Sequence, residues 1–199
     1  MSNHPHIPAE QFWRSSTYAT LGNLLALPPT IETLDRLGQI ETENRAADKA
    51  QPPLSTAWIH LARTAKVSEL TCLTEQFHTL FIGVTRGELM PYGSWYQTGF
   101  LMEKPLAKLR KDLQRLNIQR QSTVREPEDH AAALCEVMSL LISKNVNSQK
   151  TFFTTHIESW MSPFFQDLES VGHSPFYSAV GRLGRTFLDV ESQYYSLSN

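Results

Sequence analysis

Two short motifs about thirty residues apart hold most of the side chains that could do chemistry. The first is an aromatic turn, Pro91-Tyr92-Gly93-Ser94-Trp95-Tyr96, and the second is an acidic run, Glu126-Pro127-Glu128-Asp129-His130. Tyrosine and tryptophan combine a large apolar ring with a polar tip, which suits them to contact surfaces. Carboxylates accept paired hydrogen bonds from arginine guanidinium groups. The two motifs together indicate a site that holds a partner more than one that converts a substrate.

The acidic run has two interpretations. Proline is favoured at the first helical position, so Pro127 predicts a helix that starts there, with Glu128 and Asp129 in its first turn. At that place the carboxylates would satisfy free amide groups and complement the helix dipole. Three acids and His130 within five residues exceed what capping requires. An acidic pocket for arginine side chains is therefore an equal interpretation.

An enzyme is the alternative function. A metal- or nucleotide-dependent hydrolase would use Glu126, Asp129 and His130, since carboxylates and imidazole can ligate metals. Neighbouring residues of a helix point about 100° apart, however, so Asp129 and His130 would not converge on one ion. Ser94 does not lie in a Gly-x-Ser-x-Gly elbow, and the glycines of this region lack the spacing of a phosphate loop.

The aromatic turn has a second interpretation too. Its aromatic residues could simply cover the core beside a loop.

Length and composition narrow the class of protein. The chain has 199 residues, 41% hydrophobic and 19% charged, which suits one soluble core and is short for two. Eighteen basic and twenty acidic side chains give a net charge of -2, so no nucleic-acid partner is expected. No apolar run approaches the roughly 18 residues that span a bilayer, so no stable membrane insertion is expected either.

The two cysteines and the N-terminal residues indicate the cellular compartment in which the protein works. Cys72 and Cys135 lack CxxC spacing and lie in apolar, helix-like segments, so both are expected to be buried free thiols. The first residues have neither the basic start nor the apolar stretch of a secretion signal. Both observations predict a cytoplasmic location.

Helical periodicity in nearly every segment predicts the elements that position the two motifs. A helix over residues 67–81 ends at Leu80 and Phe81, just before the aromatic turn, and a helix over residues 101–116 separates the turn from the acidic run. Glycine and proline break the pattern at residues 83–94, and polar residues break it at residues 117–125. Both breaks are expected to be functional loops.

The rest of the chain carries ordinary helix boundaries. Pro28-Pro29 ends the first helix, Thr30 caps the second, and Ser174-Pro175 starts the last one. Residues 1–8 are expected to be flexible. No convincing strand is present, so the sequence predicts an all-α fold with about 8 to 10 helices in a single domain over residues 1–199.

Three motifs in this order carry a family resemblance: Glu75-Gln76-Phe77-His78-Thr79-Leu80-Phe81-Ile82-Gly83, then the aromatic turn, then the acidic run. The ordered set resembles the TorD/DmsD/NarJ family of redox-enzyme maturation chaperones. A later run, His173-Ser174-Pro175-Phe176-Tyr177, resembles the start of the family's last helix. The similarity extends from Phe12 to Tyr194, nearly the whole chain.

The resemblance implies an all-helical TorD-like chaperone of bacterial anaerobic respiration, without catalytic activity. Such proteins bind the twin-arginine signal peptide and the apo form of a molybdoenzyme precursor, assist cofactor insertion and delay export. In the family the two motif regions line the signal-peptide site. We therefore expect the peptide-binding residues to be Leu80, Phe81, Pro91, Tyr92, Ser94, Trp95, Tyr96, Glu126, Pro127, Asp129 and His130, with no catalytic or metal-binding residues.

Some expectations rest on the family alone. Its members have been linked to guanine nucleotide binding, to handling of the client's molybdenum cofactor, and to a monomer or a domain-swapped dimer. The glycine spacing supports neither the nucleotide nor the swap. Gln97-Thr98 follows Tyr96 where many relatives have an apolar or acidic residue, so the sequence leaves the branch and the client enzyme open.

Overall fold

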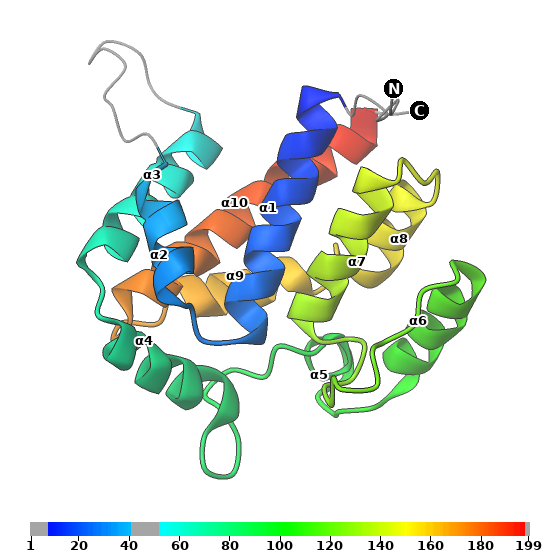
Figure 1. Ribbon diagram of the computed structural model, residues 1–199. Coiled ribbons are helices and arrows are strands. Elements are labelled where there is room, and N and C mark those ends of the chain that lie inside the picture. Colours follow the sequence, from blue (N-terminus) through cyan, green and yellow to red (C-terminus); the bar gives the residue numbers. More distant parts are fainter. Residues whose placement is uncertain (1–7, 41–51, 198–199) are drawn as a thin grey trace. The chain divides into compact units, whose positions relative to one another are not determined.

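The computed structural model describes residues 8–40 and 52–197, in which the regular elements are helices (Figure 1). In chain order they are α1 (Ala9–Ala26), α2 (Ile31–Gly38), α3 (Pro53–Val67), α4 (Leu70–Phe77), η1 (His78–Ile82), α5 (Gly93–Thr98), α6 (Lys104–Arg115), α7 (Ala131–Ser143), α8 (Gln149–His156), α9 (Met161–Glu169) and α10 (Pro175–Leu197). This confirms the predicted all-α class. The prediction for residues 1–8 lies, apart from Pro8, outside the described residues.

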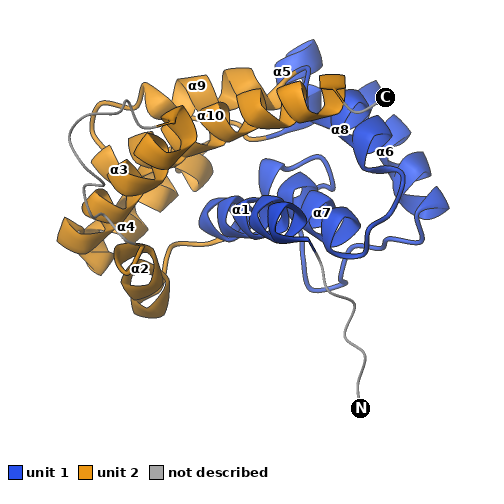
Figure 2. Cartoon of the chain, turned by 90° about the horizontal axis from the view of Figure 1, so that it is seen from above, with its two compact units in different colours: residues 1–26, 92–159 blue, residues 27–91, 160–199 orange. Residues whose placement is uncertain are grey.

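The chain forms two compact units, each built from two separate stretches (Figure 2). The first unit comprises residues 1–26 and 92–159, and the second comprises residues 27–91 and 160–199. The single domain expected over the whole chain stays a prediction. None of the helices described in either unit is long and apolar enough to cross a bilayer.

In the first unit, α1 packs along α7. Gly22 makes the close approach possible, since a Cβ atom there would lie 3.3 Å from the carbonyl oxygen of Ala132 and 3.4 Å from the Cβ of Cys135. The Ser15 hydroxyl donates a hydrogen bond to the Ser139 carbonyl at 3.0 Å. A small residue at the crossing thus lets two apolar helix faces meet, and α8 then packs on α7.

In the second unit, the long helix α10 packs on α9 and α3. A Cβ at Gly181 would lie 2.2 Å from the Glu169 nitrogen, and one at Gly184 would lie 2.3 Å from the Phe165 ring. Larger residues would therefore force the helices apart. The Ser174 hydroxyl accepts a hydrogen bond from the Tyr177 amide, which confirms the predicted cap before Pro175.

The helix predicted over residues 67–81 has a different form. Val67 ends α3, α4 begins at Leu70, and the last turn widens into the π-helix η1, a rare element often found at functional sites. Gly83 follows with φ of 61°, a left-handed conformation that favours glycine. The following loop folds back on η1, and the Leu89 amide donates to the Leu80 carbonyl at 2.9 Å. The loop predicted up to residue 94 ends earlier, because α5 begins at Gly93.

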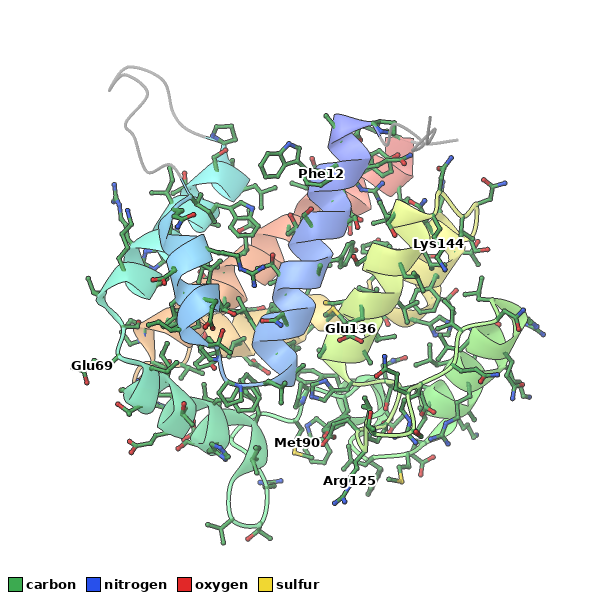
Figure 3. All side chains as sticks on the ribbon, viewed as in Figure 1. Phe12, Glu69, Met90, Arg125, Glu136 and Lys144 are labelled. Atoms are coloured by element: carbon green, nitrogen blue, oxygen red, sulfur yellow. The ribbon has the colours of Figure 1, made fainter. Side chains whose placement is uncertain are left out.

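Several apolar side chains lie at the surface of the described helices. Phe12, labelled in Figure 3, lies at the N-terminal end of α1 and is 58% exposed. Trp13 is 65% exposed, and the two rings touch edge to face. Cys72 is also exposed, which contradicts the prediction of two buried thiols, whereas Cys135 is buried and both are free. The short helix α4 buries Leu73 and Phe77, and Cys72 lies beside that apolar stripe.

Candidate functional site

Backbone pairing joins the two predicted motifs within the first unit. Tyr92 and His130 form an isolated antiparallel bridge, and the Gly93 amide donates to the Asp129 carbonyl at 2.9 Å. The aromatic turn and the acidic run therefore lie side by side, although 38 residues separate Tyr92 from His130. We call this arrangement, Tyr92 to Ser94 with Glu126 to His130, the polar clasp.

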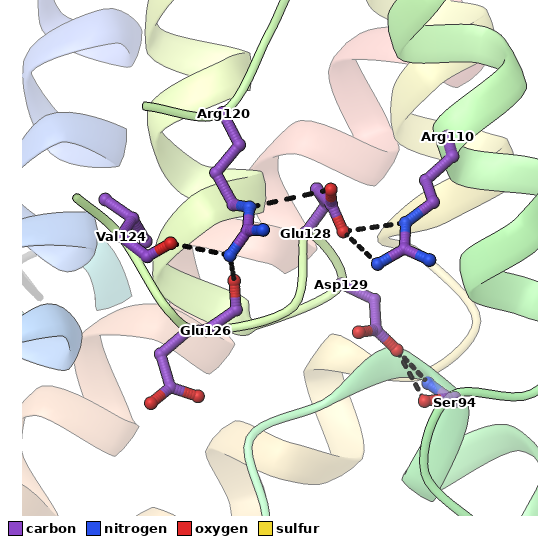
Figure 4. Close-up of polar contacts among 7 residues, drawn as sticks. All are labelled: Ser94, Arg110, Arg120, Val124, Glu126, Glu128 and Asp129. Atoms are coloured by element: carbon purple, nitrogen blue, oxygen red, sulfur yellow. Dashed lines mark hydrogen bonds and ion pairs between the residues drawn. The ribbon is translucent and has the colours of Figure 1, made fainter. Parts of the chain in front are cut away.

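Asp129 and Ser94 join the two motifs of the polar clasp through side-chain contacts (Figure 4). One carboxylate oxygen, Oδ2, accepts hydrogen bonds from the Ser94 amide at 2.8 Å and the Ser94 hydroxyl at 2.6 Å. Both residues are buried, with exposures of 0% for Ser94 and 3% for Asp129. The other oxygen, Oδ1, is buried and has no hydrogen-bond partner in the structure. A buried acceptor without a hydrogen bond lowers the free energy of unfolding, and a donor that pairs with it removes this cost.

His130 caps α7 and corrects the predicted start of this helix. The helix begins at Ala131, not at Pro127, and the His130 Nδ1 accepts a hydrogen bond from the Ala132 amide at 3.1 Å. Glu128 and Asp129 therefore precede the helix and do not fill its first turn. The pairing of Tyr92 with His130 holds the backbone of His130 extended and so delays the helix. Burial lowers the pKa of His130 to about 4, and the ring is neutral at pH 7.

Glu126 lies at the outer edge of the polar clasp. Its carboxylate accepts a hydrogen bond from the Tyr92 hydroxyl. Burial of the ring and this hydrogen bond raise the pKa of Tyr92 above its usual value. The Tyr92 ring also contacts the His130 ring edge to face, with centroids 5.1 Å apart. Tyr92 thus links the exposed acid to the buried histidine.

Glu128 already binds two arginines of its own chain (Figure 4). Arg110 approaches its Oε2 with Nε at 2.9 Å and with a terminal nitrogen at 2.8 Å, and the Arg120 Nε lies 3.6 Å from Oε1. Burial opposes ionisation here, but these arginines outweigh it and lower the pKa of Glu128. Arg120 also donates to the Val124 and Glu126 carbonyls, which braces the predicted loop at residues 117–125.

Sequence reasoning missed Arg110 and Arg120 as part of this arrangement. The signal that could have found them is the dense positive charge between residues 104 and 125, directly before the acidic run.

Beside Glu128 a cavity of about 340 Å³ opens between α7 and the loop, with an apolar floor that includes Ala133, Val137 and Leu140.

The remaining predicted residues are placed as follows. Trp95 and Tyr96 are half-buried on α5, Pro127 is half-buried in the polar clasp, and Pro91 is buried. Leu80 and Phe81 belong to η1 in the second unit.

Within the second unit the Leu80 side chain is fully buried, and Phe81 is half-buried. The Phe81 ring packs edge to face on Tyr177, with centroids 5.6 Å apart. The structure brings together five of the expected site residues, namely Tyr92, Ser94, Glu126, Asp129 and His130. A groove that also includes Leu80, Phe81 and Pro91 stays a prediction.

The polar clasp gives no support to the metal alternative. Among the described residues no group of three or more His, Cys, Asp or Glu side chains could hold a metal ion. Asp129 faces Ser94, and the His130 Nδ1 is used by the Ala132 amide, so these neighbours serve different partners.

Known proteins share this fold. A redox enzyme maturation protein from Archaeoglobus fulgidus, described as putative, superposes with a TM-score of 0.58 over 95% of this chain and 96% of that one. The two are 19% identical, so this likeness shows the fold alone.

The family follows from the sequence itself. The family model described as "Nitrate reductase delta subunit" matches residues 47–166, which is more than half of the chain. The chain therefore belongs to this family, and the resemblance to the TorD/DmsD/NarJ group is confirmed.

Two curated relatives are similar to this chain. The chaperone protein TorD of Aliivibrio fischeri is 25% identical over 91% of this chain and 94% of its own length. The probable Tat proofreading chaperone DmsD of Haemophilus influenzae is 30% identical over 56% of each chain.

Proposed function

We propose that this chain is a non-catalytic cytoplasmic chaperone that binds the twin-arginine signal peptide of a molybdoenzyme precursor. It holds the apo form of that enzyme, assists cofactor insertion and delays export. Membership of the family and the names of the relatives, chaperone protein TorD and probable Tat proofreading chaperone DmsD, support the chaperone part. The peptide part rests on the chemistry of the polar clasp.

The unpartnered Oδ1 of Asp129 is the observation that carries the peptide assignment. Ser94 fixes the carboxylate through Oδ2, so Oδ1 is held in place as a desolvated acceptor. A guanidinium group offers the strong donors that such an acceptor lacks. An arginine of the signal peptide would satisfy Oδ1 and remove the cost of leaving it unpaired.

The surroundings of Asp129 suit the rest of a twin-arginine leader. Glu126 lies at the surface and offers a second carboxylate, from which an incoming arginine would displace the Tyr92 hydroxyl. Tyr92, Trp95 and Tyr96 are half-buried and supply apolar contact area for the segment that follows the arginines. The recognised partner is thus a peptide that is basic at one place and apolar beside it.

Calorimetric titration with the leader peptide of a candidate molybdoenzyme tests the proposal. Asp129→Ala removes the acceptor, and we expect affinity to fall by on the order of 2–5 kcal/mol, the usual cost of losing one partner of a desolvated charge pair. Exchanging both leader arginines for lysine should weaken binding to the unmodified chain as well, since lysine lacks the planar fork of donors.

A matched control is Asp35→Asn, which removes an exposed acid from α2 of the second unit. This variant should bind the leader with unchanged affinity. Equal affinity of the Asp129→Ala and Asp35→Asn variants would exclude the polar clasp as the arginine site. Asp129→Ala must also retain its helical circular dichroism, so that a loss of binding does not reflect unfolding.

The finer family properties remain predictions for this chain. Guanine nucleotide binding, handling of the client's molybdenum cofactor and the choice between a monomer and a domain-swapped dimer follow from the resemblance. Titration with GDP and light scattering of the purified chain would test them directly.

A further inference from the structure

The segment from residue 104 to residue 125 concentrates positive charge. It contains seven lysines and arginines against the single acid Asp112, a net charge of +6 in a chain whose net charge is -2. The segment forms α6 and the loop that follows it, and it ends at Arg125, at the lower edge of Figure 3. The rest of the chain is therefore strongly acidic in comparison, so this positive charge is a local feature of the first unit.

Helical spacing places four of these cations on one outward stripe. The buried side chains of α6 are Leu106, Leu109 and Leu113. At 100° per residue, the positions opposite this apolar face hold Lys104, Lys108, Lys111 and Arg115, at the spacing i, i+4, i+7 and i+11. The stripe runs about 16 Å along the helix. We call these four residues the cationic stripe.

The lysines of the cationic stripe are not neutralised by the protein. Within the described parts of the chain, no ion pair engages Lys104, Lys108 or Lys111, and all three are exposed. Arg115 pairs with Asp112 at 2.7 Å, and Asp112 also binds His156 at 3.0 Å. The acid nearest the start of the helix is the exposed Glu103. Most of the positive charge of the cationic stripe is therefore available to an external partner.

An exposed apolar turn directly precedes the cationic stripe. Phe100, Leu101 and Met102 are 69%, 41% and 73% exposed, and Met102 adopts a left-handed backbone with φ of 60°. Three consecutive exposed apolar residues are unusual in a surface turn. None of them lines the cavity beside Glu128. They are exposed, and they directly precede Lys104 in the chain.

We propose that the turn at residues 100–102 and the cationic stripe form a docking surface for an anionic lipid bilayer. A row of exposed lysines is attracted to acidic headgroups, and an adjacent aromatic and two aliphatic side chains can enter the interface. Exposed lysines without ion partners, next to exposed apolar side chains, are the combination by which proteins bind the surface of an anionic bilayer. The association is peripheral and separate from the polar clasp, so it does not rest on the proposed leader binding.

Sedimentation with vesicles tests the proposal on the full chain. The unmodified chain should bind vesicles of phosphatidylglycerol and phosphatidylcholine (30:70) in 50 mM NaCl, and it should be released from them by 0.5 M NaCl. It should not bind pure phosphatidylcholine. The triple variant Lys104→Gln, Lys108→Gln, Lys111→Gln should lower the partition coefficient on the order of a hundredfold, since each cation near an anionic surface contributes about fivefold.

Two further variants separate the apolar contribution to binding from the effect of removing charge elsewhere. Phe100→Ser with Met102→Ser should weaken binding to the same vesicles without changing its salt dependence. The control variant Arg63→Gln, Lys66→Gln, Lys144→Gln removes three exposed charges elsewhere, and it should bind almost as well as the unmodified chain. Thermal unfolding checks that each variant is folded.

Three results would overturn the proposal. The first is no binding of the unmodified chain to the anionic vesicles at low salt. The second is an equal loss of binding in the two triple variants. The third is binding to native membranes that disappears after protease treatment, with no binding to pure lipid, since this would identify an acidic protein as the partner.

Discussion

The acidic turn at residues 126–130 and the basic segment at residues 104–125 adjoin in sequence but hold their charges in different ways. Asp129 and Glu128 are fixed by short hydrogen bonds from Ser94 and Arg110. The lysines of the cationic stripe are exposed and without ion partners among the described residues. The fixed positions of the carboxylates therefore decide what the acidic turn can bind. The exposed lysines of the basic segment attract a partner through long-range electrostatic interactions. The first should respond to pH and point mutation, and the second to salt.

The largest expected effect of pH on stability concerns His130. Its pKa is about 4 in the folded chain and 6.5 in the unfolded chain, because burial disfavours the charged ring. Between pH 6.5 and pH 4 the unfolded chain binds a proton that the folded chain does not, so the free energy of unfolding falls as pH falls. We expect this residue to cost about 2 kcal/mol of stability between pH 7 and pH 5.

The variant His130→Asn isolates that contribution. Asparagine can still accept the hydrogen bond from the Ala132 amide, but it does not titrate. Urea unfolding at pH 7 and pH 5 should show a smaller loss for the variant than for the unmodified chain. The pKa of His156 is also lowered by burial, so part of the pH dependence will remain in both proteins. Identical losses in the two proteins would contradict the role assigned to His130.

A loss of stability at pH 7 is expected from Ser94→Ala. The variant keeps the backbone hydrogen bond to Asp129 but removes the buried hydroxyl, and a hydrogen bond to a charged group contributes about 1.5–3 kcal/mol. Urea unfolding at pH 7 measures the loss. The control Ser143→Ala removes an exposed hydroxyl that bonds only locally on α7, and it should change stability by less than about 0.5 kcal/mol. Equal losses would mean that the clasp hydroxyl does not stabilise the fold.

The smallest effect belongs to the arginines. A double-mutant cycle of Arg110→Ala and Glu128→Ala should give a coupling of about 0.2–1 kcal/mol, because the arginine side chain is 52% exposed. The coupling should shrink in 0.5 M NaCl. The same cycle with Lys104→Ala in place of Arg110→Ala should give no coupling. A coupling that is insensitive to salt would indicate a pair more buried than the structure shows.

The sequence predicts local features well where the cause is local. Pro28-Pro29 ends the first helix and Thr30 caps the second through a hydrogen bond from the Thr33 amide, as expected. The cap at Ser174 is correct for the same reason. Such signals depend on a few neighbouring residues and on the fixed geometry of a helix start.

The wrong helix start at Pro127 and the missed arginines concern residues whose partners are distant in the chain. Pro127 looks like a helix start, yet the pairing of His130 with Tyr92 holds the backbone extended there. The two arginines on Glu128 come from 8 and 18 residues earlier, a distance at which periodicity gives no information. The acidic pocket for an arginine pair of a partner stays a prediction, and Glu128, one of its three acids, binds arginines of the same chain.

The interleaving of the two units has a consequence for synthesis. The hydrogen bond between Ser15 and Ser139 joins residues 124 positions apart. At 5–20 residues per second, a ribosome needs roughly 6 to 25 seconds to add the partner of α1 after α1 itself. During that interval the apolar face of α1, with Leu21, Leu24 and Leu25, has no α7 to cover it. The second unit likewise waits for its later stretch, which begins at residue 160, after the last residue of the first unit.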